Sequence, residues 1–299
     1  MGVALLLVVI VVTVSVQQYR YQDTRHGIAM DRQTLFYPSQ TFHVTTLLKL
    51  SPDQNLFDGV GDFIAAVEKL GAKPIYAGQA VTTARKSEQI RDIQWDAIVL
   101  LQYPSRTAWH DLSENTEYVS SIAKFRETYS LGLERPAVTN LVVPLFFQAR
   151  RAIEFIKGKP ERNPFQRVQT PDRIPADVQA QLDYVDQLVD THSGYGKDAL
   201  VVVNFQKMGN AKQTAANSEY GNEMMAVLAE HGGGLMHFGK AVTLEGNADF
   251  DQIAIVYYPG IEFFFSLVRS NFFQSIVGGK QLGDDFAVLT VPILPHLRH

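Results

Sequence analysis

The chain repeats itself, and this internal repeat constrains the possible folds more than any other feature of the sequence. Three segments of the first half match three segments of the second half in the same order, with similar spacing between them. The matching pairs are residues 77–82 with 238–243, 95–104 with 250–259, and 141–145 with 289–293. Each match is short, so the shared order carries the inference that the chain is a tandem duplication.

Each copy shows strand and helix patterns in the order β-α-β-β-α-β. In the first copy we expect strands over residues 43–50, 75–85, 95–103 and 137–146, with helices over 53–70, capped by Asp53, and over 106–129. In the second copy we expect strands over residues 200–208, 235–244, 252–258 and 286–294, with helices over 211–231 and 261–277. This order is the ferredoxin-like motif, an antiparallel four-stranded sheet with both helices on one face.

The sheet of such a unit has a second apolar face that needs a cover. Two copies in one chain can bury these faces together and close a barrel, for which 299 residues are long enough. We therefore predict an α+β fold in which two tandem ferredoxin-like units form one intramolecular barrel. The predicted regions are a membrane anchor (1–17), a juxtamembrane linker (18–41), the first unit (42–146), a helical and proline-rich insertion (147–198) and the second unit (199–295).

The N-terminus predicts a membrane anchor. Residues 3–16 are apolar except for Thr13 and Ser15, and no small-x-small cleavage site follows them. The run is shorter than the roughly 20 residues of a typical span, and a buried strand is the alternative. The arginines that follow, at 20, 25 and 32, favour a cytoplasmic body, whereas basic residues upstream in a longer native chain would reverse this orientation. The membrane side therefore stays open.

Composition excludes several kinds of chemistry. The isoelectric point near 6.1 and the net charge of −4 argue against nucleic acid as a principal partner. Without cysteine, the chain has no disulfide, thiolate nucleophile or thiolate zinc site. The sequence also lacks a phosphate-binding glycine loop, a Gly-x-Ser-x-Gly elbow and a His-Glu-x-x-His motif, and no metal site is predicted.

The second copy carries a set of short motifs that resembles a known group of proteins. These motifs are Val-Val-Val-Asn-Phe at 201–205, His-Gly-Gly-Gly at 231–234, Leu-Glu-Gly at 244–246, Phe-Asp at 250–251 and Tyr-Tyr-Pro at 257–259. Together they resemble the dimeric α+β barrel superfamily and, within it, the family catalogued as domain of unknown function 1330. The resemblance covers nearly all of the second copy and, more weakly, residues 42–146.

The resemblance implies a fold and a cavity rather than one activity. Relatives in the superfamily include small monooxygenases, lactone isomerases, haem-binding peroxidases and ligand-binding regulators, and fold alone does not choose among them. The first copy has Thr46 where the second has Asn204, and it lacks the triple glycine and the Leu-Glu-Gly. If those features form a pocket, the first copy has lost it and serves as the structural partner.

Three side chains of the second copy are candidates for catalysis: His237, Asn204 and Glu245. His237 lies among small apolar neighbours and suits an acid–base group or a haem ligand, the alternative being a hydrogen-bonded core histidine. Asn204 can hold a carbonyl or a water, or tie down a strand end. Glu245 can act as a base or belong to a simple turn. We predict a ligand pocket lined by Asn204, His237, Tyr258 and Tyr76, the last being the counterpart of His237 in the first copy.

Five phenylalanines of the second copy predict an exposed surface for a partner protein or a membrane. Three consecutive aromatic residues on a helix cannot all face one core, so at least one should lie outside. Burial against the insertion is the alternative. The residues are Phe263, Phe264, Phe265, Phe272 and Phe273.

These features lead to two hypotheses of function. The first is a membrane-anchored accessory or small-ligand-binding protein without an identifiable catalytic set, tethered by residues 3–16 and serving a membrane-protein partner or a small apolar ligand. The alternative is a small-molecule enzyme of the monooxygenase or isomerase type, using a barrel cavity near His237 and Asn204. No cofactor is predicted, with haem as the one option for the enzyme.

Overall fold

The first copy is a ferredoxin-like unit followed by a long helix. The computed structural model describes residues 2, 5, 8–16, 19, 36–157 and 199–297. The elements of the first half are β1 (Phe42–Lys49), α2 (Leu56–Lys69), β2 (Lys73–Arg85), β3 (Ala97–Tyr103), α3 (Arg106–Ser113), α4 (Thr116–Ile122), β4 (Glu127–Glu134) and α5 (Thr139–Lys157). Its first helix begins at Asn55, whose side chain accepts hydrogen bonds from the backbone of the first turn, so the predicted cap at Asp53 is wrong.

The second copy repeats the same order of elements. They are β5 (Leu200–Lys207), α7 (Ala211–His231), β6 (Gly234–Thr243), β7 (Gln252–Tyr258), α8 (Ile261–Val268), α9 (Asn271–Ile276), the short turn η2 (Val277–Gly279), β8 (Asp284–Pro292) and α10 (Leu294–Leu297). Helix α7 begins with a capping box between Asn210 and Gln213 and ends at Gly232, whose φ of 81° favours glycine. The predicted elements of this copy therefore agree closely with those observed.

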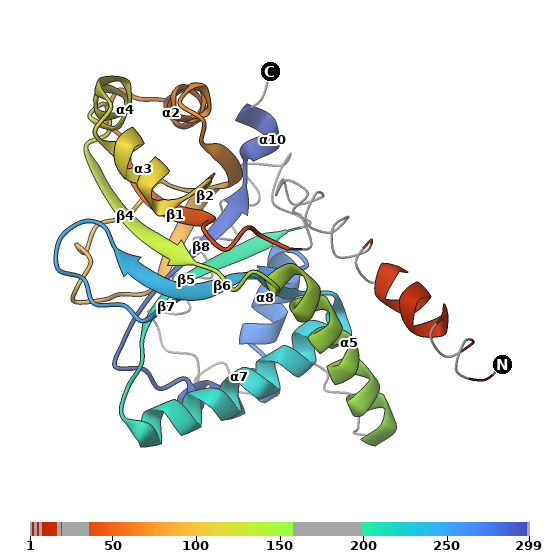
Figure 1. Cartoon of the computed structure of the whole chain (residues 1–299). Coiled ribbons are helices and arrows are strands. Elements are labelled where there is room, and N and C mark those ends of the chain that lie inside the picture. The colour runs from red at the N-terminus through yellow and green to blue at the C-terminus, as the bar shows by residue number, and fades with distance from the viewer. Residues whose placement is uncertain are drawn as a thin grey trace.

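Eight antiparallel strands close into one barrel in the order β1-β3-β2-β8-β5-β7-β6-β4. Each copy contributes four neighbouring strands, and the copies join edge to edge where β2 pairs with β8 and β4 pairs with β6. Figure 1 shows α2, α3 and α4 on one side of the barrel, with α5 and α7 on the other. The prediction that both copies form one α+β barrel is confirmed.

Alternation along each strand divides its side chains between the barrel interior and a helix layer. On β5, Val201, Val203 and Phe205 belong to the interior cluster. Leu200 and Val202 point the other way and pack in a second cluster with α7 and α8. The two faces of the same strand therefore serve two different compartments.

The predicted fourth strand of the first copy, over residues 137–146, is wrong because this segment belongs to helix α5. The fourth strand is instead β4, which begins within the last three residues of the helix predicted over 106–129 and lies otherwise in the segment between the two predicted elements. A short apolar run such as residues 141–147 does not distinguish a strand from a helix. The match of residues 141–145 with 289–293 is therefore not a structural equivalence, and β4 is the counterpart of β8.

The N-terminal segment is described only in part. Residues 8–16 are helical and their side chains are largely exposed. Among the described residues, no helix combines the length and the apolar character that a bilayer crossing requires. Most of the predicted linker and residues 158–198, including a helix expected near 176–190, lie outside the described residues.

The seam between β4 and β6 leaves no room for a side chain at Gly239. A Cβ atom there would overlap the backbone carbonyl of Glu134 and meet Leu133 Cδ1 at 2.9 Å. We expect Gly239→Ala to lower the free energy of unfolding by about 1–3 kcal/mol, because the backbone must shift to admit the methyl group. Urea denaturation followed by circular dichroism measures this loss.

Gly221, in the middle of α7, is the matched control. A Cβ atom at this position meets nothing within 4 Å. Gly221→Ala is expected to raise the free energy of unfolding by up to about 1 kcal/mol, since alanine is the better helix former. Equal effects of the two substitutions would contradict the described seam.

Candidate functional site

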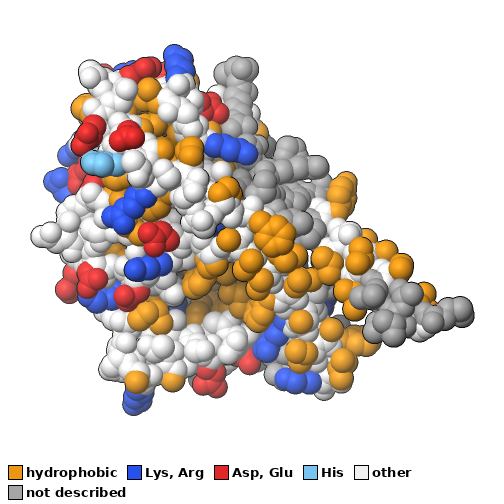
Figure 2. All heavy atoms as spheres, viewed as in Figure 1, with side chains coloured by type: hydrophobic (Ala, Val, Ile, Leu, Met, Phe, Trp, Pro, Cys, Tyr) orange, Lys and Arg blue, Asp and Glu red, His pale blue; other side chains and the backbone are white. Residues whose placement is uncertain are grey.

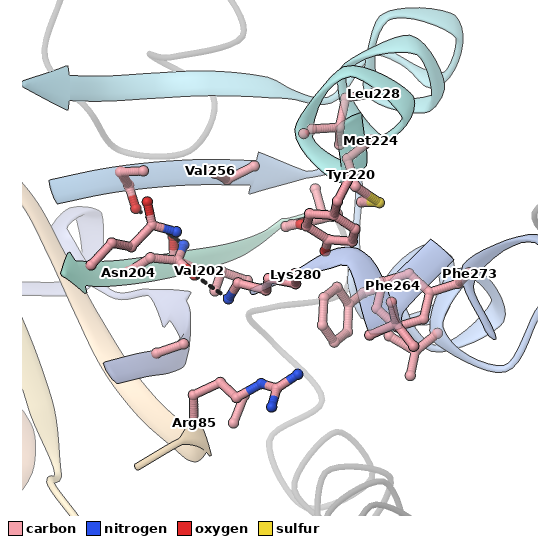
Figure 3. Close-up of a pocket in the computed structure, with 18 of the residues that line it drawn as sticks. Arg85, Val202, Asn204, Tyr220, Met224, Leu228, Val256, Phe264, Phe273 and Lys280 are labelled. Atoms are coloured by element: carbon pink, nitrogen blue, oxygen red, sulfur yellow. Dashed lines mark hydrogen bonds between the residues drawn. The ribbon is translucent and has the colours of Figure 1, made fainter. Parts of the chain in front are cut away.

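A cavity of about 750 Å³ lies between the sheet of the second copy and the helices that cover it. On the sheet side it is lined by outward-facing residues of β5, β7 and β8, and on the helix side by α7, α8 and α9. Figure 2 shows hydrophobic side chains gathered in a hollow above α7, and Figure 3 shows the lining from within. The apolar lining includes Val202, Val256, Leu289, Met224, Leu228, Phe264 and Phe273.

The same layer in the first copy is filled with aromatic side chains. Phe63 of α2 packs against Tyr118 and Phe125, with ring centroids 6.2 and 5.8 Å away. Strand register makes Thr46 the counterpart of Asn204, since Thr46 pairs with Val99 and Asn204 with Ala254. The Thr46 hydroxyl lies 3.1 Å from Ser130 Oγ within this packed layer. The duplication has therefore produced one filled layer and one hollow layer.

A largely buried lysine is one of two cationic residues in the cavity wall. Lys280 Nζ lies 2.6 Å from Asp285 Oδ2, and the two side chains are only 12% and 13% exposed. Burial lowers the pKa of the Lys280 ammonium, and the nearby Arg85 lowers it further, while Asp285 opposes both effects. An amine that gives up its proton more readily than an ordinary lysine can serve as an acid–base group.

Asn204 orients this lysine. Its Nδ2 donates to the carbonyl of Ala254 at 3.1 Å and to that of Val202 at 3.4 Å, which fixes the amide. The opposite end of the amide, Oδ1, then faces Lys280 Nζ at 3.4 Å, the contact drawn as a dashed line in Figure 3. Asn204, which we predicted to line a ligand pocket, lines this cavity, and its role toward a ligand stays a prediction.

Three further polar side chains reach the cavity from different elements. Arg85 comes from the end of β2, which belongs to the first copy, and Tyr220 and Tyr258 come from α7 and β7. Burial raises the pKa of both tyrosines, so their hydroxyls stay protonated at neutral pH. Tyr258 also contacts Phe264 edge to face, with ring centroids 4.9 Å apart.

His237 does not line this cavity. It is fully buried inside the barrel, where its ring lies 5.9 Å from that of His43 and its Nδ1 is bonded to the guanidinium of Arg135. The same guanidinium donates to Tyr37 and Asn140 at 2.8 and 3.0 Å. The predicted pairing of His237 with Asn204 in one pocket is wrong, because the two side chains lie on opposite faces of the sheet.

A bulge explains the position of His237. The register of β6 shifts between Leu235 and His237, and β2 shifts in the same way between Pro74 and Tyr76. Tyr76 likewise points into the barrel, where its hydroxyl lies 2.7 Å from Thr290 Oγ1. Tyr76 is therefore the counterpart of His237, but neither belongs to the cavity.

Glu245 lies outside the cavity as well. Its Oε2 accepts a hydrogen bond from the backbone N–H of Ser130 at 3.2 Å. The next residue, Gly246, has a φ of 63°, which marks a tight turn that favours glycine. Of the three catalytic candidates, the structure thus brings only Asn204 into the cavity.

The five phenylalanines that we predicted to form an exposed surface are instead packed against the second copy. Phe263 and Phe265 are 6% and 5% exposed, and Phe264 and Phe273 line the cavity. Phe272 is half-buried against the same cluster. Three consecutive aromatic residues find cover because α8 packs on β7 and α9 while Phe263 also meets His231 of α7, with ring centroids 5.3 Å apart.

The histidine that the sequence suggested as a haem ligand does not reach this cavity. Within the described part of the chain, the cavity lining contains no histidine, and His237 is enclosed in the barrel and bonded to Arg135. The described residues also contain no cluster of three or more His, Cys, Asp or Glu side chains able to hold a metal ion.

Sequence reasoning missed the two cationic residues of the cavity, Lys280 and Arg85. Lys280 follows a short Val-Gly-Gly turn between α9 and β8, which matches no catalytic motif. Arg85 comes from the other copy of the repeat, so only the pairing of β2 with β8 reveals its position. In the structure, β2 has 13 residues against 7 for β3, and its extra length carries Arg85 beside β8.

Comparison with known proteins finds similarity in structure only, since no family model and no curated protein matches the sequence. A proposed monooxygenase from Lactobacillus acidophilus matches with 10% identity and a TM-score of 0.40, covering 85% of this chain and 94% of the other. A proposed monooxygenase from Fusobacterium nucleatum matches with 8% identity and a TM-score of 0.44, over 86% and 94%. A chlorite dismutase mutant from Candidatus Nitrospira defluvii matches with 12% identity and a TM-score of 0.43, over 90% and 100%.

The closed barrel described above, built by two ferredoxin-like units of one chain, has the architecture that the resemblance to dimeric α+β barrels implied. The narrower resemblance to domain of unknown function 1330 is not shown, because no family model matches. With TM-scores below 0.5, the likeness assigns no reaction to this chain.

The hypothesis of a membrane-anchored accessory protein without a catalytic set is wrong. Among the described residues no helix is suited to cross a bilayer, and the cavity wall contains a lysine paired with Asp285 that this hypothesis did not foresee. The alternative hypothesis, a small-molecule enzyme using a barrel cavity near His237 and Asn204, agrees with the cavity in part, because Asn204 lines it and His237 does not.

The buried pair of Lys280 and Asp285 predicts a large loss of stability when the carboxylate is removed. We expect Asp285→Asn to lower the free energy of unfolding by about 3–5 kcal/mol at pH 7, because a buried ammonium loses its counter-charge. The deficit should shrink as pH rises toward the ordinary lysine pKa of 10.5, since the folded variant then releases its proton before the unfolded chain does.

Asp92→Asn is the matched control for this measurement. Asp92 lies 2.9 Å from Lys86 Nζ, but these side chains are 67% and 66% exposed. An exposed pair contributes less than about 1 kcal/mol. Urea titrations of both variants across pH 7–10 make the comparison, and similar losses in the two would show that Lys280 is not effectively buried.

Proposed function

We propose that this protein is a small-molecule enzyme that binds an apolar substrate in the cavity of the second copy and moves a proton with Lys280. One observation carries the proposal: a buried amine with a lowered pKa lies in the wall of a largely apolar cavity. Sites that combine an apolar pocket with a perturbed titratable group are typical of enzymes.

The chemistry that these residues favour is an isomerisation. The neutral Nζ of Lys280 takes a proton from a carbon next to a carbonyl group, and the ammonium so formed returns it to a different carbon. Asp285 stabilises the ammonium between the two steps, and the Tyr220 hydroxyl is a donor for the enolate oxygen. Bonds and protons balance without any oxidant.

The alternative hypothesis named both monooxygenation and isomerisation. The buried amine favours isomerisation, because a positioned proton acceptor is what that reaction requires. Asn204 acts here as a positioning residue, since its amide is fixed by two backbone carbonyls and faces the lysine. The first copy supports the site as the packed half of the barrel.

We predict that Lys280→Met slows proton exchange at substrate carbon by about 100-fold or more, the usual contribution of a general base. The measurement follows loss of the α-proton signals of 2-decanone and γ-decalactone by NMR in D₂O. With the natural enzyme, the rate should rise with pH and level off below 10.5, because the neutral amine is the active form and its pKa is lowered.

Lys212→Met is the control, since Lys212 is an exposed residue near the start of α7 that does not line the cavity. It should exchange protons at the natural rate. Exchange that survives in Lys280→Met, or a rate with no rise toward alkaline pH, would exclude Lys280 as the base.

A further inference from the structure

The charged side chains that line the cavity are both cationic. Among the described residues, its lining includes two cationic side chains, Arg85 and Lys280, and no Asp or Glu. The charge of Lys280 is balanced by Asp285, which lies behind it at 2.6 Å and does not line the cavity. The charge of Arg85 is therefore the one that a ligand would meet uncompensated.

Arg85 has no hydrogen-bond or ion-pair partner among the described residues. Its charge nevertheless acts on the cavity, because it opposes the rise in the pKa of the Tyr220 hydroxyl. Figure 3 shows the side chain extending from β2 toward the space below Lys280. Arg85 is an exposed residue at the edge of the cavity, so its guanidinium is open both to water and to an anionic group of a ligand seated there.

The remainder of the cavity is suited to an apolar body. Aliphatic side chains from the sheet face aromatic rings from the helices, among them Val202, Val256, Phe264 and Phe273. A volume of about 750 Å³ falls in the range that encloses a drug-sized molecule. A ligand that satisfies both parts of the site needs one anionic group at the end of an apolar body.

We propose that the substrate is a monocarboxylate with an apolar body, and that Arg85 binds its carboxylate at the edge of the cavity. This inference rests on the proposed function and names the class of substrate. Arg85 can donate two parallel hydrogen bonds to a carboxylate, which fixes the orientation of the body relative to Lys280.

The site is then composite, with the anchor supplied by the first copy. Strand β2 pairs with β3 as far as Gln79 and continues beside β8 as far as Arg85. The first copy, whose own helix layer is filled, thus supplies Arg85, the residue that selects a carboxylate ligand for the cavity of the second copy. This division explains why the extension of β2 matters to the second copy.

The test compares a fluorescent carboxylic acid, cis-parinaric acid, with its methyl ester. The natural protein should bind the acid about tenfold more tightly than the ester at pH 8, because a charge-assisted hydrogen bond is lost in the ester. Arg85→Gln should reduce binding of the acid to the level of the ester while leaving ester binding unchanged. Unchanged ester binding also shows that the variant is folded.

Arg126→Gln is the control, because Arg126 is an exposed arginine of the first copy that does not line the cavity. It should keep the full preference for the acid. Equal binding of acid and ester by the natural protein would overturn the carboxylate inference and leave the proposed function standing. A preference that persists in Arg85→Gln would overturn the role of Arg85. Failure of both probes to bind would overturn the inference and the proposed function together.

Discussion

Backbone pairing across two seams, β2 with β8 and β4 with β6, is the interaction on which the rest of this structure depends. Neither four-stranded sheet could leave its inner face exposed to water, and the two seams bury both faces in one interior. They also tolerate little change, since Gly239 at one seam lies against the carbonyl of Glu134. The β2–β8 seam has a second effect, because it carries Arg85 into the layer of the other copy.

The two copies share a topology but differ in how the space between sheet and helices is filled. In the first, Phe63, Tyr118 and Phe125 fill the space between sheet and helices. In the second, the same space is open and contains a buried lysine held by Asp285 and Asn204. A barrel closed by two copies needs only one of its helix layers to be solid, so the other is free to carry a ligand site.

How well the sequence predicted each element depended on the strength of its pattern. The strands and helices of the second copy were predicted closely, because α7 is long and its strands are rich in β-branched residues. Strand β4 was missed although Tyr129, Leu131 and Leu133 alternate with smaller residues, since the apolar run that follows it looked equally strand-like. The candidate site was only partly predictable, with Asn204 and Tyr258 found and Lys280 missed.

The sequence by itself determined the duplication and the order of elements, because local periodicity and internal repeats can be recognised without the structure. The closed α+β barrel follows from that order. Tertiary structure alone decided which compartment each polar side chain enters. A bulge before His237 and the opposite faces of the sheet separate it from Asn204, while the β2–β8 pairing brings Arg85 to Lys280 across the boundary between copies. Whether helices fill the space above a sheet depends on packing between side chains that are far apart in the sequence, so local sequence patterns do not predict it.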